Sequence, residues 1–159
     1  MCGVTDAYQP VERRLGLTRR CLQVFADFRN PVSIITKNAL VTRDIDILAE
    51  LAAHDAISVC LSFTTLDPNL HRVMEPRASH PNQRLHAIEV LTRAGIPVGV
   101  NVAPVIPGLT DHEIPRLLEA AAEAGATGVG WMLLRLPRQV KTLFLDWLAR
   151  EQPRRAARV

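Results

Sequence analysis

The residues of this sequence best suited to hold a ligand are polar side chains that follow short apolar segments. They recur where four runs of apolar and β-branched residues end, and the set is Lys37, Ser62 with Thr64 and Thr65, Asn101 and Arg135. An ammonium, hydroxyls, an amide and a guanidinium can all form hydrogen bonds to a polar small molecule. The spacing therefore predicts a ligand site assembled from the ends of several strands.

Motifs for other common chemistries are absent from the sequence. The five histidines contain no HxxxH or HExxH pattern, which argues against a histidine metal site. The segment Gly125–Gly130 has the spacing G-x-x-G-x-G and precedes a predicted strand, so it does not match the dinucleotide-binding fingerprint in spacing or context. An ordinary β/α-barrel hydrolase or lyase fragment is a further alternative, but no set of nucleophile, base and acid is visible for it.

The elements that must position the polar residues alternate between strand and helix. The apolar runs predict strands at Val32–Thr36, Ile57–Ser62, Pro97–Pro104 and Gly128–Leu134. Helical periodicity and capping residues predict helices at Leu17–Phe28, Thr42 or Asp44 to Ala53, Asp67–Met74, Pro81–Ala94, Thr110 or Asp111 to Ala124, and Gln139–Arg150. This order indicates parallel strands with helical crossovers, as in an open α/β sheet or a β/α barrel, and ligands bind at the carboxyl edge in both.

Length and composition narrow the class of protein. The chain has 159 residues and is 48% hydrophobic, which fits one soluble domain or a piece of one. Its 19 basic and 16 acidic residues leave an excess that Arg154, Arg155 and Arg158 supply entirely, so charge gives no support to nucleic-acid binding. No apolar run is long enough to span a membrane, no signal peptide is visible, and Cys2, Cys21 and Cys60 lie far apart. We expect a reducing, cytoplasmic compartment.

Several short motifs, taken in their order along the chain, resemble those of the radical S-adenosylmethionine (SAM) proteins of the branch similar to spore photoproduct lyase. The resemblance covers Val4 to about Glu151. Its most specific motifs are Thr5-Asp6-Ala7-Tyr8-Gln9-Pro10, Ile35-Thr36-Lys37, Leu61-Ser62 running to Glu75-Pro76-Arg77, and Val102 to Asp111. It implies a partial parallel β/α barrel of the TIM-barrel type, and it divides the chain into a partial core domain at 1–151 and a solvated basic tail at 152–159.

The family holds a four-iron four-sulfur cluster through three cysteines spaced CxxxCxxC after the first strand. Electron transfer from the cluster cleaves SAM and generates a 5′-deoxyadenosyl radical. This sequence contains no CxxxCxxC, and the single thiolate of Cys2 cannot replace three ligands. An eight-stranded barrel needs about 250 residues, and the motif that begins at Thr5, which is typical of the end of a strand, follows Met1 almost at once. We therefore expect an N-terminally incomplete barrel that carries no metal ligands of its own.

The resemblance also implies which residues contact SAM. Thr5 and Asp6 match positions at the methionine amino group, although Val4 and Ala7 depart from the usual neighbours. Lys37 matches a lysine that approaches the methionine carboxylate, a physically sensible ion pair in a partly desolvated cleft. The alternative is a solvated lysine, but Lys37 is one of only two lysines in the chain.

Further matches extend the implied site across the strands. Ser62 and Arg77 match a serine and an arginine that hold the ribose hydroxyls and the carboxylate, and a strand-ending serine and a surface arginine are the alternatives. Asn101 and the backbone of Val102 to Pro104 match the strand that passes the adenine. Leu134 lies beside the adenine on the following strand, where core packing explains a leucine equally well.

The resulting expectation is the SAM-binding portion of a radical SAM enzyme, a lyase by resemblance, that is inactive without its cluster loop. Flavodoxin or ferredoxin is the implied electron donor, and no residue is assigned a catalytic role. Resemblance to this branch implies a nucleic-acid substrate for some relatives, but the neutral body of the chain does not support one here. The alternative is a non-catalytic barrel remnant that binds SAM or a partner protein through an open strand edge.

Overall fold

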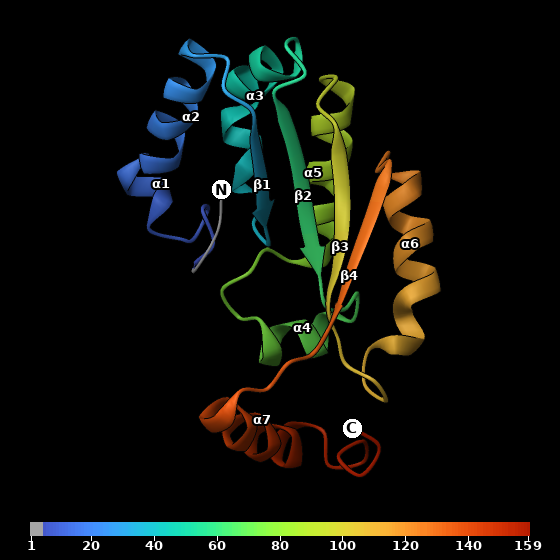
Figure 1. Ribbon diagram of the computed structural model, residues 1–159. Helices are drawn as coiled ribbons and strands as arrows, with labels where there is room; N and C mark the ends of the chain where they lie inside the picture. Colours follow the sequence, from blue (N-terminus) through green and yellow to red (C-terminus); the bar gives the residue numbers. More distant parts are fainter. Residues whose placement is uncertain (1–4) are drawn as a thin grey trace.

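Four parallel strands form the centre of the molecule. The computed structural model describes residues 5–159, so Cys2 and Val4 lie outside the described residues. The strands are β1 (Val32–Thr36), β2 (Ile57–Phe63), β3 (Val98–Val105) and β4 (Gly128–Leu133), and they pair in the order β1-β2-β3-β4 (Figure 1). The register places Ile34 beside Val59 and Ser62 beside Asn101. All four predicted strands are confirmed to within a residue or two of their bounds.

Helices connect the strands and cover one face of the sheet. They are α1 (Glu12–Leu15), α2 (Leu17–Asp27), α3 (Ile45–Ala52), α4 (Pro68–Met74), α5 (Pro81–Arg93), α6 (Ile114–Glu123) and α7 (Arg138–Glu151), with 3-10 turns η1 (Ala39–Asp44) and η2 (Asp111–Glu113). Figure 1 shows α3 and α5 behind the sheet and α7 beneath the carboxyl ends of the strands. This arrangement is a partial parallel β/α barrel, as expected.

The core lies between the sheet and its helices. Along β1 the buried residues alternate with exposed ones, so that Val32 and Ile34 face the helices and Ile35 faces the open side. The open side is the face that a complete barrel would enclose. Every residue of β4 is exposed, and Trp131 keeps 69% of its surface accessible. Within residues 5–159, no helix is both long enough and apolar enough to cross a membrane.

Two helices begin at or shortly after their expected caps, but the capping side chains are engaged elsewhere: α3 begins directly after Asp44, whereas α6 begins three residues after Asp111. Asp44 gives α3 no side-chain cap, since its carboxylate accepts hydrogen bonds from Tyr8, Arg19 and Arg43. Asn38 instead caps the preceding turn η1. Similarly, the Thr110 hydroxyl accepts from the Ile106 N–H and the Asp111 carboxylate from the Gly108 N–H, so α6 begins only at Ile114.

The basic tail is not the solvated end that the sequence suggests. Arg155 donates to the carbonyl oxygen of Leu109 at 2.8 Å, and Ala156 packs against the small apolar cluster of Leu70, Ile106, Leu109 and Leu148. Gly108 allows this close approach, because its φ is +77° and a Cβ there would come within 2.7 Å of the Arg158 carbonyl oxygen. The last residues therefore pack on the loop that follows β3.

Candidate functional site

Three of the residues singled out from the sequence line one cavity at the carboxyl end of β1. Asp6, Lys37 and Arg77 surround a space of about 260 Å³, together with Gln9, Pro10, Asn38 and Ala78. These residues come from the N-terminal turn, the end of β1 and the loop before α5. The cavity thus joins an aspartate, a lysine and an arginine that lie up to 71 positions apart in the sequence.

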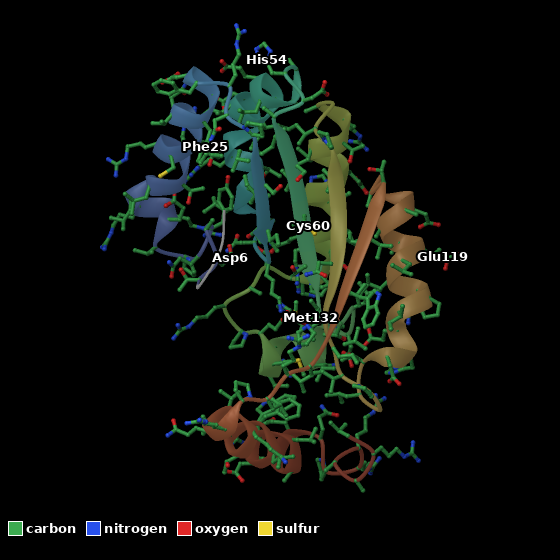
Figure 2. The ribbon with its side chains drawn as sticks, viewed as in Figure 1. Asp6, Phe25, His54, Cys60, Glu119 and Met132 are labelled. Carbon is green, nitrogen blue, oxygen red and sulfur yellow. The ribbon has the colours of Figure 1, made fainter. Side chains whose placement is uncertain are left out.

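Asp6 fixes the N-terminal turn against the end of β1. Its carboxylate accepts hydrogen bonds from the Tyr8 N–H at 2.8 Å, the Thr36 hydroxyl at 2.6 Å and the Lys37 N–H at 2.7 Å. Figure 2 shows Asp6 beside the carboxyl end of β1. The neighbouring Thr5 is exposed. Asp6 therefore has a structural role in shaping the cavity wall, whatever ligand the cavity takes.

Lys37 is not a freely solvated lysine. Its ammonium donates to the Thr64 hydroxyl at 3.0 Å and forms a short ion pair with Glu75, and the side chain is 30% exposed. The Thr64 hydroxyl also lies 2.6 Å from the same Glu75 oxygen. The ammonium is therefore held at the cavity by two neighbours that come from other loops.

Glu75 is in turn held by an arginine that is completely buried. Arg84 lies on α5, 0% exposed, with its guanidinium 3.4 Å from the second Glu75 oxygen and 4.9 Å from the centre of the Phe63 ring. It also donates to the Ser62 carbonyl oxygen at 2.5 Å. Burial by itself would raise the pKa of Glu75, but the charge and hydrogen bond of Lys37, with Thr64 and Arg84, hold that pKa below its usual value. We call Lys37, Glu75 and Arg84 the charge triad.

Ser62 and Asn101 lie side by side on the neighbouring strands. They are partners in the β2–β3 register, and Ser62 is buried while Asn101 is partly exposed. Gly130 leaves room for the Asn101 side chain, because a Cβ there would lie 3.3 Å from the Asn101 amide oxygen. Neither residue lines the cavity formed by Asp6, Lys37 and Arg77.

The other implied contacts also lie away from that cavity. The Val102 side chain belongs to the core and is 4% exposed, so its backbone alone is left for a ligand. Pro104 follows a cis peptide bond in the irregular end of β3. Leu134 lies one residue beyond β4, donates its N–H to the Val105 carbonyl and packs against the cluster of Leu70, Ile106, Leu109 and Leu148.

Sequence patterns alone assign no ligand-binding role to Thr64, Glu75 or Arg84. Thr64 is a polar residue just after a predicted strand, and Glu75 belongs to the same short motif as Arg77. Arg84 carried a signal that could have been used: it occupies the buried stripe of α5 with Pro81, Ala87, Ile88 and Leu91. An arginine in an apolar stripe requires a buried partner, because an unpaired charge is costly there.

The described cysteines do not fit an iron–sulfur cluster. Cys21 is exposed on α2, whereas Cys60 lies half-buried in the middle of β2, where burial raises the pKa of its thiol. Figure 2 shows Cys60 within the sheet and away from Asp6. Within residues 5–159, no group of three or more His, Cys, Asp or Glu side chains is placed to hold a metal ion.

The parallel sheet and its helices place the protein in the β/α-barrel class, in which ligands bind at the carboxyl edge where these charged side chains gather. The family model described as the radical SAM superfamily matches residues 3–121, and the chain belongs to that superfamily. SAM-dependent radical chemistry, with SAM and a four-iron four-sulfur cluster as cofactors, is general to that superfamily.

Curated relatives share the sequence over most of this chain. Uncharacterized proteins of Mycobacterium bovis and Mycobacterium tuberculosis are each 39% identical over 156 residues, which is 97% of this chain and 46% of the relative. An uncharacterized protein of Methanocaldococcus jannaschii is 35% identical over 113 residues, 71% of this chain and 42% of the relative. The chain thus spans about half the length of these relatives.

Proposed function

We propose that this chain is the SAM-binding portion of a radical SAM enzyme of the spore photoproduct lyase-like branch. The observation that carries the proposal is the cavity in which Lys37, Arg77 and Asp6 meet, at the strand edge where proteins of this class bind ligands. Family membership supplies the identity of the ligand. The assignment to this branch rests on the resemblance of the sequence motifs around these residues.

In this proposal the methionine carboxylate of SAM binds between Lys37 and Arg77. The charge triad together with Asp6 and Arg77 of the cavity wall has a net charge of +1, from three cations and two carboxylates, so the carboxylate of a ligand is electrostatically favoured there. Thr5 and Asp6 face the methionine amino group. Ser62 contacts the ribose, and Asn101, the backbone of Val102 to Pro104 and Leu134 form the adenine side.

The cluster has to come from a CxxxCxxC segment that is not in these 159 residues, because the described cysteines do not fit it. We propose that the chain alone binds SAM and does not cleave it. Reductive cleavage to the 5′-deoxyadenosyl radical belongs to the complete family domain, with flavodoxin or ferredoxin as electron donor. Cys21 and Cys60 are free thiols, which suits a reducing, cytoplasmic location.

Titration calorimetry with SAM tests the binding directly. Lys37→Met should weaken binding about 10- to 100-fold, since a hydrogen bond to a charged group contributes about 1.5–3 kcal/mol. The matched control is Lys141→Met, which removes the other lysine, exposed on α7. Equal affinities for the two variants would contradict the assignment of Lys37. Anaerobic reconstitution with iron and sulfide should yield no 5′-deoxyadenosine from this chain, and robust product would contradict the proposed inactivity.

A second candidate function is a barrel remnant that binds a partner protein. The sheet order makes β1 and β4 edge strands, and all six residues of β4 are exposed. Edge strands with exposed apolar side chains favour association with another chain. Sedimentation velocity, together with the SAM titration, separates the two candidates: a self-associating chain that does not bind SAM would favour the remnant.

A further inference from the structure

The charge triad orders the side chain of Lys37 before any ligand is bound. A lysine side chain has four rotatable bonds and loses as much as about 2 kcal/mol of conformational entropy when it is fixed. Here the ammonium already donates to Thr64 and pairs with Glu75, although 30% of the side chain is exposed. This part of the cost of binding is therefore met when the protein folds.

We propose that Glu75 and Arg84 are positioning residues that hold the Lys37 ammonium for an incoming carboxylate. The inference rests on the proposed function, since it takes the methionine carboxylate of SAM as the ligand of Lys37. Neither Glu75 nor Arg84 lines the cavity, so they act through Lys37 and not by touching the ligand.

The hydrogen-bond inventory of the ammonium supports this role. An ammonium has three N–H donors, and among the described residues two of them are directed to Thr64 and Glu75. Because Lys37 also lines the cavity, the third donor is available to a carboxylate there. Glu75 is thus compatible with the ligand and does not have to leave when the ligand binds.

Arg84 keeps Glu75 from moving with the ligand. Its guanidinium is fixed by complete burial, by the Ser62 carbonyl and by the Phe63 ring. A carboxylate paired only with Lys37 would be free to follow the lysine toward solvent. With its second oxygen facing Arg84, Glu75 is tied to α5 and to the end of β2, so the position of the ammonium is set by the fold.

A labelling experiment without ligand tests the positioning, because the chain has only two lysines. Limited acylation with an N-hydroxysuccinimide ester, followed by mass spectrometry, gives the ratio of Lys37 to Lys141 modification. Glu75→Gln should raise this ratio about tenfold, the factor expected for losing one charge-assisted hydrogen bond. The control is Glu119→Gln, an exposed residue on α6 that Figure 2 shows away from Asp6. A ratio equal to that of the control would overturn the proposal.

A pair of ligands distinguishes positioning from a general structural effect. Glu75→Gln should weaken the binding of SAM about tenfold but leave the binding of decarboxylated SAM unchanged, since that ligand has no carboxylate for Lys37. Equal losses for both ligands, or tighter binding of SAM, would overturn the proposal. If circular dichroism shows that Glu75→Gln is unfolded, Thr64→Val decides, with the same direction expected in both assays. Failure of the wild-type chain to bind either ligand would overturn the proposed function, whereas the labelling ratio separately shows whether Glu75 holds the ammonium.

Discussion

Removal of the buried guanidinium at position 84 should destabilise the protein more than removal of any exposed arginine. Arg84→Leu keeps an apolar side chain in the buried stripe of α5 but leaves the Ser62 carbonyl and one Glu75 oxygen without their donor. Breaking a buried ion pair from one side costs about 3–5 kcal/mol. Glu75 still has Lys37 and Thr64, so we expect the lower end, about 3 kcal/mol.

Urea denaturation followed by circular dichroism measures this loss. In thermal denaturation of a chain of this length, a loss of about 3 kcal/mol corresponds to a fall in Tm of roughly 6–12 °C. The matched control is Arg93→Leu, on the same helix but with its side chain 76% exposed, where the change should stay within about 0.5 kcal/mol. A loss below about 1 kcal/mol for Arg84→Leu, or one equal to the control, would refute the structural importance of the buried pair.

Three further predictions concern neighbouring features. The folded chain holds the pKa of Glu75 below its usual value, so the stability it contributes is complete above the unfolded pKa of about 4.3 and is lost as the pH falls through the folded pKa. In urea titrations from pH 6 to 3, Glu75→Gln should therefore lose less stability than wild type, and parallel curves would contradict this. Gly108→Ala should cost about 1–2 kcal/mol and expose the tail to limited trypsin cleavage, whereas Gly16→Ala, also at positive φ but with no atom within 4 Å of the added Cβ, should leave the tail protected. In Asp6→Asn the new amide N–H group faces one of the N–H or O–H groups that donate to the Asp6 carboxylate, so the free energy of unfolding in urea should fall by about 1–3 kcal/mol. An unchanged free energy of unfolding would contradict the role of Asp6 in fixing the turn.

The strands and the gathering of polar residues at their ends could be predicted from the sequence for a local reason. A run such as Val32–Thr36 combines β-branched residues, a length typical of strands and a preceding proline, and each signal lies within a few residues of the others. Parallel order then places the carboxyl ends at one edge without further information. For this reason the sequence alone identifies Lys37 as a candidate site residue.

The pairing of the charges could not be predicted in the same way. Glu75 lies 38 residues from Lys37 and 9 from Arg84, and nothing in local periodicity says which of the chain's cations meets it. Side-chain capping could not be predicted for the same reason: Asp44 precedes α3 as expected, but Tyr8, Arg19 and Arg43 occupy its carboxylate. Local patterns predict elements, whereas the use of a polar side chain depends on what the fold brings to it.

The two halves of the proposed site differ in how firmly the fold supports them. The carboxylate half stands on β1, β2 and α5, where Arg84 and Thr64 are buried and every charged group of the triad has a partner. The adenine half stands on β3 and β4, and β4 is exposed along its whole length. A binding surface is preorganised only where packing restricts its side chains. The affinity of this chain for SAM should therefore come mainly from the methionine end, and covering β4 with further polypeptide would strengthen the adenine end.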